Sequence, residues 1–249
     1  MQKLSGKTAL ITGGNSGIGL ATARLFREHG ARLIITGRDK SSLAQARNVL
    51  GDDVLAIQSD AGKLADIESL MQQIQKQFGH LDILFVNAGS AQAAPFDFVS
   101  EQQFDATVAI DFKGVFFTIQ KALPLLSKSA AIIVNTSITN QMGTPNLSVY
   151  AACKAALRSL VQTLGLELIG RGIRINAISP GPIATPMYGR LGLPDEVEQG
   201  LKAEITNKSP IKRFGAPDEV AKVALFLACE DSSYIVGDEI VVDGGMSLL

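Results

Sequence analysis

Short apolar runs alternate with longer amphipathic stretches along the chain, and this alternation limits the fold more than any other feature. The apolar runs predict seven strands, at 8–12, 32–36, 54–58, 83–87, 131–136, 173–179 and 239–242. The stretches between them predict helices at 18–28, 40–50, 64–78, 101–126, 148–169 and 218–228. A strand followed by a helix, repeated, is typical of parallel pairing, and strands that are apolar on both faces indicate helices on both sides of the sheet. The sequence therefore predicts an α/β fold with a doubly wound parallel sheet, and residues 1–249 are expected to form one domain.

The segment from Pro180 to Pro210 interrupts this alternation and is rich in proline and glycine. Compact domains rarely carry long loops without a function, so residues 186–212 are predicted to be a substrate lid. A loosely helical surface excursion is the alternative.

Charge and composition favour a compact protein that binds small molecules. The net charge is −1, which gives no electrostatic footprint for nucleic acid or for an anionic membrane. No apolar secretory segment precedes the first strand, and no run approaches the ~20 apolar residues that span a bilayer, so we expect a cytoplasmic location. Cys153 and Cys229 are expected to be reduced thiols, and no spacing typical of metal ligands is found, so no metal is expected.

The stretch from Ser137 to Lys154 is the candidate catalytic region. Tyr150 and Lys154 are four residues apart in a predicted helix, so the phenol and the ammonium project from one face. A nearby cation favours the phenolate and lowers the pKa of a tyrosine, which makes the phenol a better proton donor. Ser137, at the end of the run AAIIVNTS, can hydrogen-bond a substrate oxygen and hold it against Tyr150.

A glycine-rich turn follows the first predicted strand and leads into a helix. Its candidate binding residues are Gly13, Asn15, Ser16, Gly17, Ile18 and Gly19. Glycines allow a tight turn and close backbone approach, so the free amides at the helix N-terminus can face a pyrophosphate. A position after a strand and before a helix is the context that a dinucleotide site requires.

These motifs together resemble the short-chain dehydrogenase/reductase family over the whole chain. The matching elements are Thr12-Gly-x-x-x-Gly17-x-Gly19, Asn87-Ala88-Gly89, Ser137, Tyr150-x-x-x-Lys154 and Pro180-Gly181. The resemblance implies a Rossmann-type fold, a nicotinamide cofactor across the strand ends, and a homotetramer built through the helices at 101–126 and 148–169.

The resemblance also implies roles for individual residues. Asp60, followed by Ala61, is expected at the adenine ring, and Asn87 to Gly89 form the turn that supports the adenosine side. Ile183 and Thr185 are expected at the nicotinamide carboxamide, after the Pro180-Gly181 pair. Tyr150 and Lys154 also belong to the cofactor site, because Lys154 is expected to hydrogen-bond the nicotinamide ribose.

The end of the second predicted strand bears on the choice of dinucleotide. Relatives that prefer NAD have an acidic residue where this chain has Gly37, and the next residue is Arg38. A guanidinium can hold a ribose phosphate with two hydrogen bonds, which favours NADP(H), with NAD(H) as the alternative. Two residues argue for NAD(H). Many NADP-dependent relatives have a basic residue where this chain has Ser16, and the carboxylate of Asp39 reduces the positive charge beside Arg38.

Asp111 departs from the family pattern, which usually has asparagine at this position. In the family, the backbone carbonyl of that residue helps to hold a water that leads to the lysine, and aspartate keeps this carbonyl. We include Asp111 among the candidate catalytic residues because its carboxylate can also perturb Lys154 in a dry site.

The resulting hypothesis is an NADP(H)-dependent oxidoreductase that reduces a ketone to a secondary alcohol reversibly, with Tyr150 as general acid or base. An NAD-dependent alcohol or sugar-alcohol dehydrogenase and a non-catalytic dinucleotide-binding regulator are the alternatives. Mostly apolar residues are candidates to line the substrate pocket, namely Ala91, Ala93, Ile138, Met142, Leu147, Tyr188 and Leu191. They favour a hydrophobic ketone as the partner, although such residues can equally be packing.

Overall fold

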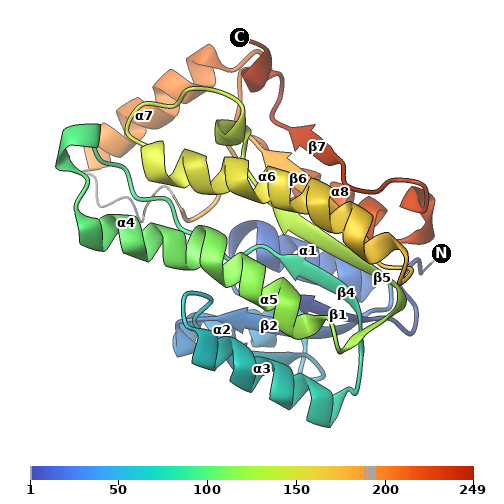
Figure 1. Ribbon diagram of the computed structural model, residues 1–249. Coiled ribbons are helices and arrows are strands. Elements are labelled where there is room, and N and C mark those ends of the chain that lie inside the picture. Colours follow the sequence, from blue (N-terminus) through green and yellow to red (C-terminus); the bar gives the residue numbers. More distant parts are fainter. Residues whose placement is uncertain (1, 188, 190–194) are drawn as a thin grey trace.

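The computed structural model describes residues 2–187, 189 and 195–249, and it contains a parallel sheet of seven strands (Figure 1). The strands are β1 (Thr8–Ile11), β2 (Arg32–Gly37), β3 (Leu55–Gln58), β4 (Leu81–Val86), β5 (Leu126–Asn135), β6 (Arg174–Pro180) and β7 (Glu239–Val242). Their order is β3-β2-β1-β4-β5-β6-β7, so the chain winds outward first on one side of β1 and then on the other. The direction of winding reverses between β1 and β4, and ligands of open α/β sheets bind beyond the carboxyl ends of the strands at such a point.

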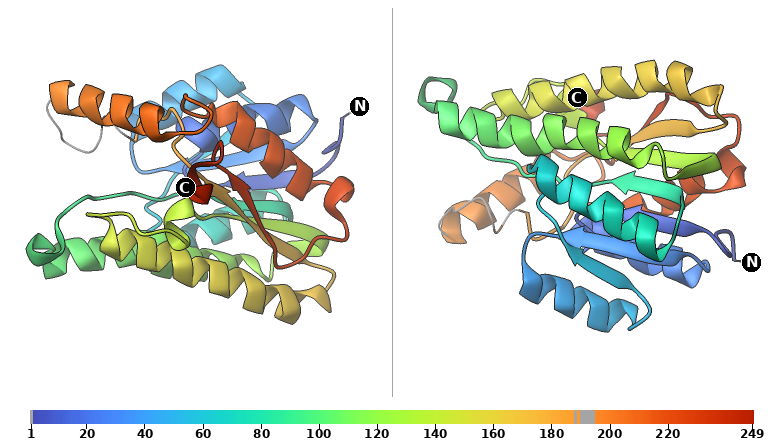
Figure 2. Two further views of the ribbon diagram at one scale, coloured as in Figure 1. Left: turned by 90° about the horizontal axis from the view of Figure 1, so that it is seen from above. Right: turned by 60° about the horizontal axis from the view of Figure 1, so that its bottom comes forward.

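Helices cover both faces of the sheet, as predicted (Figures 1 and 2). The helices are α1 (Gly17–Glu28), α2 (Lys40–Leu50), α3 (Leu64–Gln77), α4 (Glu101–Val108), α5 (Gly114–Ala122), α6 (Ser148–Ile169), α7 (Asp195–Lys208) and α8 (Pro217–Ala228). Residues of α1, α2 and α8 share one core cluster, and residues of α3, α5 and α6 share the other. Neighbouring strand residues contribute to opposite clusters, as Leu10 and Ile11 do, which explains why the strands are apolar on both faces.

The helix predicted at 101–126 is the largest error in the predicted elements. The structure has α4, then a π-helical turn at Ala109–Lys113, then α5 ending at Ala122, and β5 begins at Leu126. The first part of β5 is polar, and its pairing with β4 shifts in register between Leu81 and Ile83. These residues therefore lack the apolar pattern by which the rest of β5 was recognised. The bounds predicted for α2, α6 and β7 are confirmed.

Helix α7 lies within the segment predicted to be a lid. It has no buried residue, so it lacks the apolar stripe by which the other helices were recognised in the sequence. Two of the candidate pocket residues in this segment, Tyr188 and Leu191, lie outside the described residues.

Gly114, the first residue of α5, allows this helix to approach the loop that follows β3. A Cβ atom at Gly114 would lie 2.0 Å from the carbonyl oxygen of Ala61, so any side chain would force the helix and the loop apart. The absence of a side chain at position 114 therefore allows α5 and the Asp60–Ala61 loop to be in direct backbone contact.

We predict that Gly114→Ala destabilises the fold by about 3 kcal/mol, the upper end of the usual cost of overpacking. Gly200→Ala is the matched control, because Gly200 is in α7 and no atom lies within 4 Å of the Cβ that it would gain. In an exposed helix this change should stabilise by up to about 1 kcal/mol. Urea unfolding of both variants measures the difference, and equal unfolding free energies would contradict the close-approach explanation.

Candidate functional site

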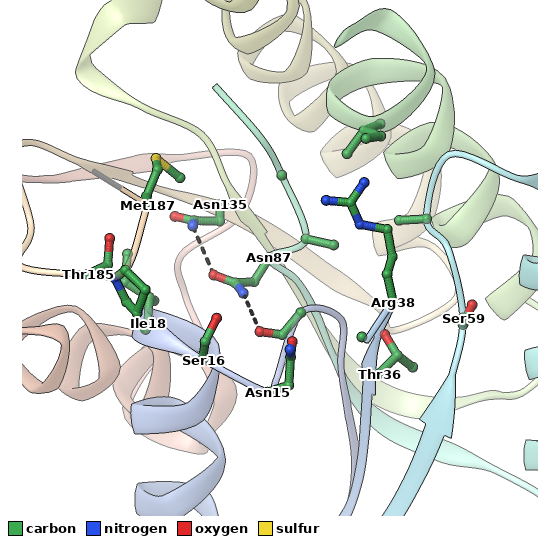
Figure 3. A pocket seen from close by; sticks show the side chains of 18 of the residues that line it. Asn15, Ser16, Ile18, Thr36, Arg38, Ser59, Asn87, Asn135, Thr185 and Met187 are labelled. Carbon is green, nitrogen blue, oxygen red and sulfur yellow. Dashed lines mark hydrogen bonds between the residues drawn. The ribbon is translucent and has the colours of Figure 1, made fainter. Parts of the chain in front are cut away.

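A pocket lies beyond the carboxyl ends of β1, β2 and β4, where the winding of the sheet reverses (Figure 3). The predicted cofactor residues that line it are Gly13, Asn15, Ser16, Gly17, Ile18, Arg38, Asp60, Ala61, Asn87, Ala88, Gly89 and Thr185. In Figure 3, Ile18, Thr185 and Met187 lie at one end of the pocket, and Arg38, Thr36 and Ser59 lie at the other. An elongated ligand can therefore span the pocket from Thr185 to Arg38.

The glycine-rich turn leaves room for an anion at the start of α1. Gly13 and Gly17 have positive φ angles of 64° and 53°, and a Cβ atom at Gly19 would lie 2.2 Å from the carbonyl oxygen of Gly13. Ser16 precedes the helix without accepting a hydrogen bond from its amides, and the first turn has no acidic residue. The positive end of the helix dipole therefore faces the pocket, which fits the pyrophosphate of a dinucleotide.

Asn87 connects this turn to the neighbouring strands. Its side-chain nitrogen donates to the carbonyl oxygen of Thr12 at 3.0 Å, and its backbone amide donates to Thr12 Oγ1 at 2.9 Å. Asn135, at the end of β5, donates from Nδ2 to Asn87 Oδ1 at 3.0 Å (Figure 3). These bonds connect the ends of β1, β4 and β5. They therefore hold the glycine-rich turn in a fixed position relative to Asn135, which lies just before the Ser137 region.

The environment of Gly37 explains why this chain has no acidic side chain at the end of β2. A Cβ atom at Gly37 would lie 2.7 Å from Asn15 Cγ, and Asn15 is itself held by a 2.8 Å hydrogen bond from its Nδ2 to Ser42 Oγ. Asn15 thus occupies the space that a longer side chain at position 37 would need. Arg38 is exposed and stands beside this end of the pocket (Figure 3).

Ser137, Tyr150 and Lys154 come together beyond the carboxyl end of β5. Ser137 precedes a 3-10 turn at Ile138–Asn140, and Tyr150 and Lys154 lie on the first turns of α6. The hydroxyl of Ser137 lies beside the phenol of Tyr150, and Lys154 Nζ lies 5.3 Å from the centre of the tyrosine ring. Lys154 Nζ also donates to the backbone carbonyl of Asn135 at 3.1 Å.

Asp111 pairs directly with Lys154 inside the protein. It lies in the π-helical turn and is fully buried, with Oδ1 3.2 Å from Lys154 Nζ, and its Oδ2 accepts from the backbone amide of Ser90 at 3.2 Å. A Cβ atom at Gly89 would lie 2.8 Å from Asp111 Oδ1, so this ion pair requires glycine at position 89. Among the described residues, no group of three or more His, Cys, Asp or Glu side chains could hold a metal ion.

The pKa shifts in this cluster follow from burial and from the ion pair. Burial raises the pKa of the Tyr150 phenol; Lys154 acts to lower it and Asp111 to raise it, so that the net shift is upward. Burial acts to lower the pKa of Lys154, but the charges of Tyr150 and Asp111 raise it overall. Burial also raises the pKa of Asp111, against the opposing effect of Lys154. Lys154 therefore acts on Tyr150 in the direction predicted from the sequence, but burial outweighs this effect.

Among the other predicted site residues, Pro180, Gly181 and Ile183 do not line the pocket, whereas Asp60 does. Gly181 approaches the start of the C-terminal turn so closely that a Cβ atom would lie 2.6 Å from Asp243 Cβ, and Pro180 ends β6. Ile183 is buried and forms an isolated parallel bridge with Gly215. Asp60 lines the pocket, and its Oδ1 accepts from the Gly62 amide at 3.0 Å.

The sequence reasoning did not identify Asn135 as a site residue. It lines the pocket, bonds to Asn87 and accepts from Lys154, so it connects the pocket with the Ser137 cluster. A polar residue at the end of the apolar run AAIIVN was the available signal. Ser59, Ile110, Pro186 and Met187 also line the pocket without having been predicted.

Comparison with known proteins agrees with this arrangement. Residues 13–247 match the family profile described as "Enoyl-(Acyl carrier protein) reductase". The chain is 42% identical to "Oxidoreductase asL5" of Sarocladium schorii, over 99% of this chain and 98% of the relative. It is 36% identical to the "3-oxoacyl-[acyl-carrier-protein] reductase FabG" of Thermotoga maritima, over 98% of this chain and 99% of that protein. A crystal structure of a short-chain dehydrogenase/reductase from Brucella melitensis, "Glucose/ribitol dehydrogenase", superimposes with a TM-score of 0.91 at 33% identity, covering 98% of both chains.

The fold, the dinucleotide-type pocket and these relatives define an oxidoreductase of the Rossmann-type class that uses a nicotinamide dinucleotide. More narrowly, the chain belongs to the short-chain dehydrogenase/reductase family. Members of this family act on small-molecule substrates. The described residues include no helix that is long and apolar enough to cross a membrane.

We predict that Asp111→Asn shifts the acidic limb of the pH profile for alcohol oxidation to lower pH. Oxidation requires the phenolate of Tyr150, and Asp111 raises the pKa of this phenol, so removing the negative charge should lower it. The limb reports the coupled cluster rather than Tyr150 alone. Turnover at the optimum should stay within a few-fold, because asparagine keeps both the shape and the backbone carbonyl.

The pH dependence of kcat for oxidation, measured for the parent and the variant, checks this expectation. A limb at the same pH would show that the Asp111 charge does not act on Tyr150. A loss of turnover of a hundredfold or more would show that the carboxylate itself takes part in proton transfer.

Proposed function

We propose that the protein is an NADP(H)-dependent reductase that converts a ketone to a secondary alcohol, reversibly. The observation that carries this proposal is the convergence of Ser137, Tyr150 and Lys154 beside the dinucleotide-type pocket. The family relationship makes the protein an oxidoreductase, and the relative named as a 3-oxoacyl reductase supports carbonyl reduction.

The cluster can supply the proton and the positioning that carbonyl reduction needs. The hydroxyl of Ser137 lies beside the phenol of Tyr150, so a carbonyl oxygen between them would accept from both. Tyr150 then donates its proton to this oxygen, and the Lys154 ammonium stabilises the phenolate that remains. The nicotinamide, when bound, supplies the hydride.

Burial raises the pKa of Tyr150, so the phenol is in its protonated form in the unliganded protein. A phenol whose pKa is raised keeps its proton at neutral pH, so the acid form needed for reduction is the resting state. In the opposite direction the phenol must first lose this proton, which burial and Asp111 both oppose. A raised pKa also makes this phenol a weaker acid, so proton donation depends on the Lys154 ammonium, which stabilises the phenolate.

The end of β2 supports NADP(H) as the preferred cofactor. Asn15 fills the space beside Gly37, so no carboxylate stands there to repel a ribose phosphate, and Arg38 lines the pocket.

The alternative, an NAD-dependent alcohol or sugar-alcohol dehydrogenase, is favoured by the relative named "Glucose 1-dehydrogenase" from Gluconobacter oxydans, which is 35% identical over 99% of this chain. A non-catalytic dinucleotide-binding regulator has no need of a buried Lys154 paired with Asp111.

We further propose that residues 186–212 form a substrate lid on a single domain. A hollow of about 700 Å³ lies between the Ala184–Pro186 segment and α7, and it is lined partly by Ala203 and Phe214. The exposed helix α7 thus stands over the end of the pocket where the nicotinamide is expected. A mostly apolar lining suits a hydrophobic ketone.

A homotetramer is proposed from the exposed apolar side chains of α5 and α6. Phe116, Leu166 and Ile169 are 36%, 82% and 44% exposed, although they lie on helices whose other faces form the core. Burial of such side chains between copies of the chain would remove them from water.

We predict that Tyr150→Phe reduces ketone turnover by 10²- to 10⁴-fold while NADPH binding is nearly unchanged, because the variant lacks only the proton donor. Tyr234→Phe is the control, since the Tyr234 side chain is fully exposed. NADPH consumption at 340 nm with a panel of aryl ketones, β-keto esters, diketones and sugars measures turnover. Residual turnover within about threefold of the parent would exclude Tyr150 as the acid.

We predict that Arg38→Ala raises the dissociation constant of NADPH by about one to two decades and leaves that of NADH nearly unchanged. The lost hydrogen bond to a charged phosphate is worth roughly 1.5 to 3 kcal/mol. Arg47→Ala, an exposed arginine on α2, should affect neither cofactor. Fluorescence titration measures both constants, and equal losses for NADPH and NADH would favour the NAD-dependent alternative.

A further inference from the structure

A buried carboxylate lies outside the pocket, next to the segment that carries Ser137. Glu239 is the first residue of β7, and its side chain is only 6% exposed. Burying a carboxylate is costly unless its oxygens accept hydrogen bonds. The groups that bond to the Glu239 carboxylate therefore show which part of the protein this side chain holds in place.

Glu239 bonds to both sides of the Ser137 turn. Its Oε1 accepts from Thr136 Oγ1 at 2.5 Å and from Asn140 Nδ2 at 2.7 Å. Its Oε2 lies 3.5 Å from Nε of Arg158, which is on α6. One carboxylate oxygen thus connects the residue before Ser137 with the last residue of the turn that follows it.

The Ser137 turn has few bonds of its own. It is a single 3-10 turn, in which the Asn140 amide donates to the Ser137 carbonyl at 3.0 Å and the Thr139 amide donates to Ser137 Oγ at 3.3 Å. Such turns have poor hydrogen-bond geometry, whereas bonds to a carboxylate are shorter and stronger than neutral ones. Thr136 is also held to β6, because its backbone amide donates to the Ile178 carbonyl at 2.8 Å. Glu239 therefore adds a second attachment at Thr136 and holds Asn140 at the other end of the turn.

The position of Glu239 is fixed independently of Ser137. Glu239 pairs with Ala177 of β6, and Asn176 Oδ1 accepts from the backbone amide of Asp238 at 3.0 Å. Asn176 also donates from Nδ2 to the Ile235 carbonyl at 2.9 Å, which holds the loop before β7. The sheet therefore provides a fixed point from which the carboxylate reaches the turn.

We propose that Glu239 is a positioning residue for the reaction: by holding Thr136 and Asn140, it keeps the Ser137 hydroxyl against the phenol of Tyr150. This inference rests on the proposed function, in which Ser137 and Tyr150 share the substrate oxygen. Glu239 itself is not among the residues that line the dinucleotide pocket.

The test compares Glu239→Ala with Glu239→Gln. Alanine loses the acceptor for Thr136 and Asn140, so kcat for ketone reduction should fall by about ten- to a hundredfold, as for a reacting group misplaced by about 1 Å. Glutamine keeps an amide oxygen for both donors, so its kcat should stay within about threefold of the parent. The dissociation constant of NADPH should be unchanged in both variants, because the pocket is intact.

A double-mutant cycle with Ser137→Ala separates positioning from general stabilisation. If Glu239 acts through Ser137, adding Glu239→Ala to Ser137→Ala should cost less than about threefold more in kcat. Asn140→Ala, which removes one of the two donors, should reproduce part of the Glu239→Ala loss. Additive losses in the cycle, or an unchanged kcat in Glu239→Ala, would overturn the proposal.

Crystal structures distinguish a failure of this inference from a failure of the proposed function. A parent enzyme that reduces no ketone in the panel would contradict the proposed function. The placement of Ser137 by Glu239 is still tested in that case, because Glu239→Ala should displace residues 136–140 and lengthen the contact between Ser137 and Tyr150. A variant structure in which this turn superimposes on that of the parent would overturn the inference whatever the activity.

Discussion

The site is organised around a charge that the protein holds away from water. The ammonium of Lys154 is nearly fully buried, and it keeps its charge because Asp111 lies 3.2 Å away and the carbonyl oxygen of Asn135 accepts from it. A buried charge without such partners would be lost or would destabilise the fold. The neighbouring features follow from this requirement: the π-helical turn presents Asp111, and Gly89 leaves room for its carboxylate.

Asn135, whose carbonyl oxygen accepts from Lys154, also links the two halves of the sheet. Asn135 accepts from Lys154 through its carbonyl and donates through its side chain to Asn87, which in turn holds the strand end that leads into the glycine-rich turn. A continuous set of hydrogen bonds therefore runs from the ion pair to the place where the pyrophosphate is expected. Asn135 is therefore shared by the wall of the dinucleotide pocket and by the surroundings of Lys154.

The sequence predicted the fold and most of the pocket because those features depend on local patterns. Strands apolar on both faces predict a covered parallel sheet, and the glycines of the first turn predict close backbone approach. The polar start of β5 and the exposed helix α7 escaped prediction because neither has an apolar periodicity. Asn135 and Glu239 were missed for another reason: each acts through partners distant in the sequence, and only the folded chain shows that Thr136 and Glu239 meet.

The contact between Glu239 and Thr136 joins residues that are 103 positions apart. Glu239 belongs to β7, the last strand along the chain, so this contact cannot form until β7 has been synthesised. During synthesis, a chain that still lacks β7 can already have assembled the earlier strands and the glycine-rich turn, since domains grow from the N-terminal end. The Ser137 turn then lacks its bonds to Glu239, although Thr136 already bonds to Ile178 of β6. The order in which the chain leaves the ribosome thus places the completion of the reaction centre after that of the dinucleotide pocket.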